Sequence, residues 1–106
     1  MRGRRGAKRQ ISLRNGLERA MITIELFGIP RLRAGIGVVH LEAGTLATAL
    51  RKLGRVCPAL AGTVIVGELL QPAYRACVNG QRFVSDPTTP LADGDVLLVM
   101  AADVGG

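Results

Sequence analysis

Polar and apolar residues alternate from Met21 onward, and this alternation is the first regular pattern in the chain. A period of two over six residues predicts a half-buried strand. Its apolar face would carry Ile22, Ile24 and Leu26. Gly28-Ile29-Pro30 should end the strand, because proline has no amide hydrogen to donate to a neighbouring strand. We expect residues 31–35 to form a loop or wide hairpin, and a weaker alternation predicts a second strand over 38–42.

The period then changes to that of a helix. Thr45 is placed to cap the first turn with its hydroxyl group, and Gly54 is placed to follow the last turn. Pro58 prevents simple continuation of the helix. Apolar residues at i, i+3, i+4 and i+7 would form its buried face: Leu46, Ala49, Leu50 and Leu53.

Residues 59–73 have no clear period, and both a short helix and an irregular crossing segment fit them. Beyond them, Asn79-Gly80 separates two strand-like runs over 74–78 and 81–84. That dipeptide favours a type I′ hairpin, because both central residues of the turn need positive φ. Further on, Asp93-Gly94-Asp95 predicts a tight turn into the run 96–100.

The run 96–100 is apolar at every position, unlike the alternating first strand. It therefore predicts a central strand that is covered on both faces, or covered on one face and left to meet a partner. One helix of the expected length covers only one face of a sheet. The uncovered face is a candidate protein-binding surface.

The chain has 106 residues, which suits a single domain with a small aliphatic core. Its net charge of +6 comes from the first twenty residues, which hold seven of the fourteen basic residues and one of the eight acidic ones. Residues 21–106 are therefore neutral, and the folded part is not expected to bind nucleic acid through a basic face.

Residues 1–20 form a basic extension that we expect to be disordered, because they hold few apolar residues. A nucleic-acid-binding arm, an organellar targeting segment and a weak amphipathic helix are all consistent with this composition. An upstream extension without a function, including a start codon placed too early, is the simplest interpretation. The patterned domain would then be residues 21–106.

Residues that could carry out chemistry are few. Cys57 and Cys77 are expected to be reduced and partly buried, and His40 is expected to face solvent on a strand. No metal-ligand spacing is present, so neither a metal nor a bound cofactor is predicted. No apolar run is long enough to span a membrane, and no secretory signal pattern is present, so we expect a cytoplasmic protein.

The sequence ends in Gly105-Gly106, which follow Val104. Without side chains, these two residues could enter a narrow active site and bring a terminal carboxylate with them. Taken alone, they are explained more simply as an ordinary frayed terminus, and the rest of the chain must decide between the two interpretations.

Several of these features occur together, in order, in one known family. They are Leu26-Phe27 at the end of a strand, Gly44-Thr45 before a Leu-rich helix, Val78-Asn79-Gly80, the segment 91–96 and the final Gly105-Gly106. Residues 21–106 thereby resemble the ubiquitin-like β-grasp sulfur carriers, closest to the small subunit of molybdopterin synthase. The resemblance implies an α+β fold, with a mixed sheet of four to five strands and one main helix packed on one face.

The resemblance also implies a function. An E1-like adenylating enzyme would use ATP to activate the Gly106 carboxylate, which would become a thiocarboxylate. A second partner, the large subunit of a sulfur-accepting synthase, would receive the sulfur in cofactor biosynthesis, and the expected product is molybdopterin. The chain would then be a carrier and not an enzyme. Candidate partner-binding residues are Phe27, Arg82, Leu97, Val99, Ala101 and Val104.

Other functions remain open at this stage. The sulfur could serve thiamine or cysteine biosynthesis. Gly106 could instead be joined to lysine side chains, which would make the protein a ubiquitin-like modifier. In a different class, the chain could be a small interaction or nucleic-acid-binding module that uses its basic extension.

Overall fold

The computed structural model describes residues 20–102. The expected extension lies outside these residues except for Ala20, which is buried and whose carbonyl accepts a hydrogen bond from Ala43 N. The elements in chain order are β1 (Met21–Leu26), α2 (Ile29–Ala34), β2 (Val38–Glu42), α3 (Leu46–Val56), the 3₁₀ turn η1 (Pro58–Leu60), β3 (Ile65–Val66), β4 (Leu69–Leu70), β5 (Tyr74–Val78), β6 (Arg82–Val84) and β7 (Val96–Ala101).

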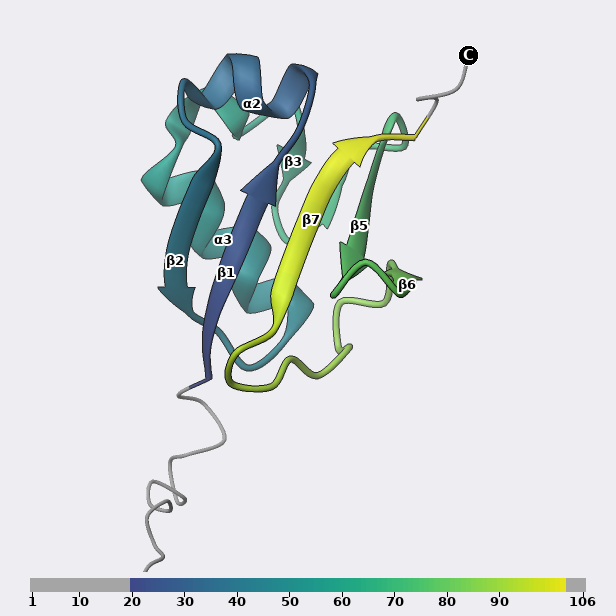
Figure 1. Cartoon of the computed structure of the whole chain (residues 1–106). Helices are drawn as coiled ribbons and strands as arrows, with labels where there is room; N and C mark the ends of the chain where they lie inside the picture. The colour runs from purple at the N-terminus through teal and green to yellow at the C-terminus, as the bar shows by residue number, and fades with distance from the viewer. Residues whose placement is uncertain (1–19, 103–106) are drawn as a thin grey trace, which may run out of the picture.

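Five strands form one mixed sheet in the order β2-β1-β7-β5-β6. β7 lies in the centre, parallel to β1 and antiparallel to β5. α3 packs across one face of the sheet, while α2 lies at the end where β1 finishes (Figure 1). The predicted mixed sheet with one main helix on one face is therefore confirmed.

The main helix forms as its apolar pattern predicts. Thr48 N donates a hydrogen bond of 3.3 Å to the hydroxyl of Thr45, which caps the first turn. All four predicted apolar positions are buried against the sheet: Leu46, Ala49, Leu50 and Leu53. The predicted end at Gly54 is wrong, because the helix continues to Val56. A glycine only weakens a helix, whereas Pro58 disfavours helical backbone at the preceding Cys57.

Residues 31–35 do not form the expected loop, because most of them belong to α2. Pro30 lies in the first helical turn, where its missing amide hydrogen costs nothing, and its side chain is buried. Gly35 ends the helix at φ 80°, and its N–H donates to Arg31 O at 3.0 Å. A proline that ends one strand can thus also begin the next helix.

Residues 59–73 hold more structure than either sequence-based alternative. After η1 comes a hairpin of β3 and β4, in which Ile65 pairs with Leu70 and Val66 with Leu69. Strands of two residues are too short to produce a readable period. The second predicted hairpin is confirmed, since Asn79 and Gly80 have φ values of 55° and 67° between β5 and β6.

Candidate functional site

β7 is the last regular element within residues 20–102 and is held on both sides. Its Val99 lies opposite Leu26 of β1, and its Ala101 lies opposite Tyr74 of β5. One residue later, Ala102 N donates a hydrogen bond of 2.7 Å to Ala73 O. The backbone is therefore fixed as far as Ala102. Val104, Gly105 and Gly106 lie outside the described residues.

The beginning of β7 is tied to the β5–β6 turn by side chains. Asn79 Nδ2 donates to Asp95 Oδ1 at 3.0 Å, and Asn79 Oδ1 accepts from Val96 N at 2.8 Å. Asp95 also accepts from Ala92 N at 2.8 Å, which closes the turn before β7. Two turns that the sequence analysis treated separately thus form one hydrogen-bonded unit.

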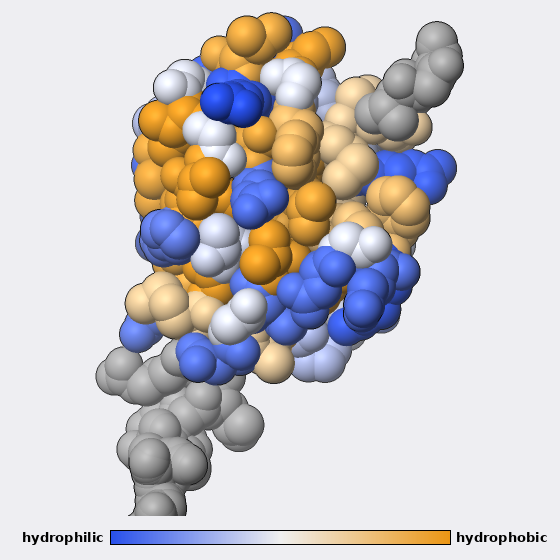
Figure 2. Space-filling model, in the orientation of Figure 1, coloured by the Kyte–Doolittle hydropathy of each residue, from blue (hydrophilic) through white to orange (hydrophobic). Residues whose placement is uncertain are grey.

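Among the described residues, no second layer covers the sheet face opposite α3 (Figure 1). Val96, Leu98 and Met100 of β7 point to this face and are half-buried. Cys77 pairs with both Leu98 and Phe83, which places all three side chains on the same side. Figure 2 shows this face, where apolar surface is interrupted and bordered by polar side chains.

The register of β7 corrects the predicted partner-binding residues. Leu97 and Val99 have no exposed surface, because they point toward α3 and belong to the core. Ala101 shares their side of the strand and is half-buried. The sequence could not fix this register, since every position of the strand is apolar. Leu98 and Met100 are the outward residues that the sequence analysis missed.

Phe27 is 41% exposed, in agreement with a role in binding. Arg82 is exposed but pairs with Val78, whose side chain lies in the core, so it extends from the sheet edge on the helix side. Phe83 is the edge residue on the uncovered face, and the Arg75 guanidinium lies 5.4 Å from its ring centroid. No signal in the sequence distinguished Phe83 from Arg82.

No protein-family model and no curated protein match this chain. Solved structures do. The crystal structure of small archaeal modifier protein 1 from Haloferax volcanii matches with a TM-score of 0.71 at 26% sequence identity. The match covers 82% of this chain and 100% of the Haloferax chain. The chain has the ubiquitin-like β-grasp fold.

Two further solved structures share this β-grasp fold. Small archaeal modifier protein 1 from Methanosarcina acetivorans has a TM-score of 0.68 at 22% identity, over 83% of this chain and 98% of its own. A Pyrococcus furiosus protein assigned as molybdopterin converting factor subunit 1 has a TM-score of 0.64 at 22% identity. That match covers 77% of this chain and 97% of the Pyrococcus chain. The predicted resemblance to the ubiquitin-like β-grasp family is thereby confirmed.

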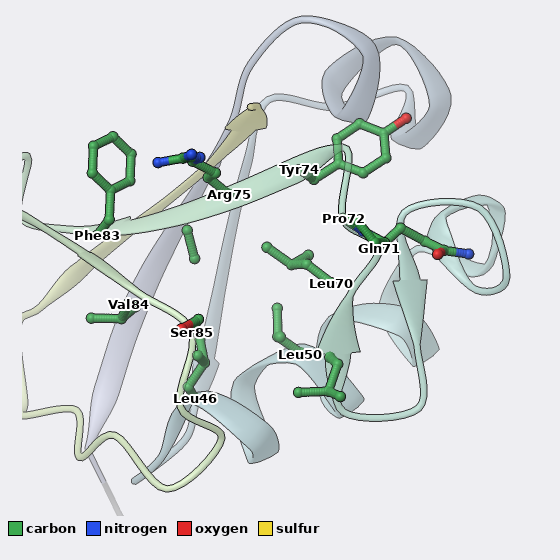
Figure 3. Close-up of a pocket in the computed structure, with 12 residues that line it drawn as sticks. Leu46, Leu50, Leu70, Gln71, Pro72, Tyr74, Arg75, Phe83, Val84 and Ser85 are labelled. Atoms are coloured by element: carbon green, nitrogen blue, oxygen red, sulfur yellow. The ribbon is translucent and has the colours of Figure 1, made fainter. Parts of the chain in front are cut away.

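A groove of about 420 Å³ lies at the β5–β6 side of the β-grasp domain. Leu46 and Leu50 of α3 and Leu70 of β4 line it on one side of β5 (Figure 3). Arg75 and Phe83 lie at its rim, on the other side of that strand. The groove is mainly apolar and has no cluster of carboxylate, histidine or thiol groups in its lining.

The side chains capable of acid–base or nucleophilic chemistry are dispersed across the domain. His40 is exposed on the uncovered face, as predicted, with Nδ1 3.0 Å from Thr23 Oγ1. Cys57 and Cys77 are free and buried, and burial raises the pKa of the Cys57 thiol. Within residues 20–102, no three potential metal ligands form a group, and no helix is long and apolar enough to cross a bilayer.

Proposed function

We propose that this protein is a sulfur carrier whose Gly106 carboxylate is adenylated by an E1-like enzyme and converted to a thiocarboxylate. The observation that carries the proposal is the position of β7. It is the central strand, bonded to β1 and β5, and it leads directly toward the residues that end in Gly105-Gly106. A rigid domain with a narrow terminal peptide suits a substrate that partner enzymes must hold.

The chemistry explains why partners are needed. An α-carboxylate has a pKa near 3.5, so at neutral pH it is an anion that resists nucleophilic attack. Attack of a carboxylate oxygen on the α-phosphorus of ATP would form an acyl-adenylate and release pyrophosphate. A reduced sulfur donor would then attack the acyl carbon and displace AMP, which leaves the thiocarboxylate.

The acceptor would be the large subunit of a synthase, and we propose molybdopterin as the product. The thiocarboxylate sulfur would attack an acceptor carbon and displace an oxygen leaving group from it. Water would then hydrolyse the acyl–sulfur bond, which leaves the sulfur on the acceptor and restores the Gly106 carboxylate. ATP would be bound by the adenylating partner and not by this chain. We place these steps in the cytoplasm, where ATP and reduced sulfur donors are available.

The uncovered sheet face is the proposed docking surface for these partners. It combines half-buried Leu98 and Met100 with exposed Phe27 and Phe83, and charged side chains border it. Interfaces of this type have an apolar centre and a polar rim. Gly105 and Gly106 would pass into the partner's active site, where a side chain would obstruct a narrow channel.

A second candidate is a protein modifier, in which the activated Gly106 forms an amide with lysine side chains of other proteins. The likeness to small archaeal modifier protein 1 at 26% identity favours it. Both functions begin with the same adenylate and differ in the nucleophile that attacks it, either a sulfur donor or a lysine amine.

The test uses the full chain, ATP, a sulfide donor and the E1-like enzyme of the same genome. Mass spectrometry of the intact chain should show a gain equal to the difference between sulfur and oxygen. In parallel, extracts of cells that express a tagged chain should be examined for higher-mass conjugates. Conjugates without a thiocarboxylate would support the modifier instead. The absence of both products, with an enzyme that is active on another carrier, would refute both functions.

A further inference from the structure

A further apolar surface adjoins the uncovered sheet face around the short helix α2 and shares Phe27 with it. Four side chains form what we call the α2 patch: Phe27, Ile29, Leu32 and Ile36. Leu32 is 80% exposed, and the other three are exposed by 41% to 47%. Single exposed apolar residues are ordinary, but four within ten residues are not scattered. In Figure 2 apolar surface gathers at this end of the molecule.

The local structure holds the α2 patch outward. Six residues are too few for a helix that is stable by itself, so its position depends on the buried Pro30 and on its two ends. Gly28 and Gly35 have φ values of 62° and 80°, which most other residues reach only with strain. The helix nevertheless turns Leu32 toward solvent. Packing within the domain therefore does not explain why residue 32 is apolar.

The α2 patch also lies where the carboxyl-terminal residues leave the domain. α2 contacts β7, and Phe27 N donates a hydrogen bond of 3.0 Å to Val99 O. The four residues from 103 to 106 span at most about 14 Å when fully extended. An active site that holds Gly106 must therefore come close to this end of the domain.

Helix α2 carries two positive charges. Arg31 and Arg33 of α2 are exposed. Within residues 20–102, an ion pair joins Arg51 and Glu68. Among these described residues, neither arginine of α2 forms an ion pair. A complementary surface would present an apolar hollow for Leu32 and carboxylates beside it.

We propose that the α2 patch is a second docking surface for the adenylating partner, which meets it with an apolar hollow bordered by Asp or Glu side chains. This inference rests on the proposed function. It adds a contact at the end of the domain to the contact through the sheet face. Leu32 would be its apolar anchor, and Arg31 and Arg33 would supply the charge.

The experiment measures two quantities for each variant with the E1-like enzyme of the same genome. They are the Kd of the full chain by calorimetry without ATP, and KM and kcat for ATP–pyrophosphate exchange. Leu32→Asp should weaken binding and raise KM at least about tenfold, because a buried leucine contributes that much or more to affinity. kcat should stay the same, since the contact is made equally before and during the chemical step.

Leu69→Asp is the matched control. Leu69 is 49% exposed on β4, an element that packs against α3 and β5. It should bind as the unmodified chain does, and Leu32→Met should retain most of the affinity. Arg33→Glu should weaken binding most at low salt, because salt screens an exposed charge pair.

The outcomes separate the two proposals. Equal Kd and KM for Leu32→Asp and Leu69→Asp would overturn the α2 contact while leaving adenylation intact. Binding of the unmodified chain without pyrophosphate exchange would refute the proposed function, and the Kd of Leu32→Asp would still decide the contact. If the unmodified chain shows no binding and no exchange, both proposals are overturned together.

Discussion

The hydrogen bonds between Asn79 and the start of β7 make a quantitative prediction about stability. Asn79→Gly removes two side-chain hydrogen bonds, one to Asp95 and one from Val96 N. It retains the turn, because glycine adopts a φ of 55° without strain. The main-chain bond from residue 79 N to Val96 O, 2.7 Å long, also remains. The substitution therefore leaves the folded turn and its main-chain bond in place.

The expected loss follows from the number and exposure of these bonds. A hydrogen bond contributes about 0.5–1.5 kcal/mol to net stability, and solvent exposure places both bonds near the lower end. The greater freedom of glycine in the unfolded chain adds up to about 1 kcal/mol. We expect the free energy of unfolding to fall by about 1–3 kcal/mol, with a decrease in Tm of roughly 4–8 °C for each kcal/mol.

Urea unfolding measures this loss, and a double-mutant cycle with Asp95→Ala isolates the pair. The coupling energy between residues 79 and 95 should be at least about 0.5 kcal/mol, because the two side chains share a direct bond. A loss below about 0.5 kcal/mol for Asn79→Gly, with no coupling, would refute the view that this unit stabilises the start of β7.

Two further predictions concern the core and its thiol. Leu53→Ala should lower the free energy of unfolding by about 2–5 kcal/mol, because Leu53 is fully buried. Leu32→Ala, at an exposed position, should change it by less than about 0.5 kcal/mol. Similar losses for the two variants in urea unfolding would contradict the placement of α3. Because burial raises the pKa of Cys57, its contribution to stability is present below the ordinary thiol pKa of about 8.5 and is lost as pH rises through the higher folded-state pKa. Cys57→Ala should remove this alkaline decline, and identical pH profiles for the two proteins would contradict it.

The sequence predicted those elements whose patterns were long or whose turns needed particular residues. Alternation identified β1, the apolar stripe and Thr45 identified α3, and Asn79-Gly80 identified the hairpin of β5 and β6. In each of these segments the local signal, whether an apolar pattern, a helix cap or a turn dipeptide, favours the same structure that the whole fold requires. Helix α2 was missed because its proline had a second interpretation, as the end of a strand.

The candidate site was harder to predict because it depends on register. A strand that is apolar at every position gives no sign of which residues face the helix, so Leu97 and Val99 were assigned to the wrong face. Pairing with β5 resolves this point and shows that Leu98 and Met100 face outward. Contacts between distant segments, such as Asn79 with Asp95, also have no local signal in the sequence.

The carrier hypothesis depends most directly on the carboxylate of Gly106. ATP–pyrophosphate exchange by the E1-like enzyme should be measured with the full chain, with a chain that lacks Gly106, and with Gly105→Val. The full chain should support exchange. Both variants should lose it while retaining the Tm of the full chain, because the substitutions lie beyond β7. Exchange by the shortened chain at the rate of the full one would contradict the central claim that Gly106 is the activated residue.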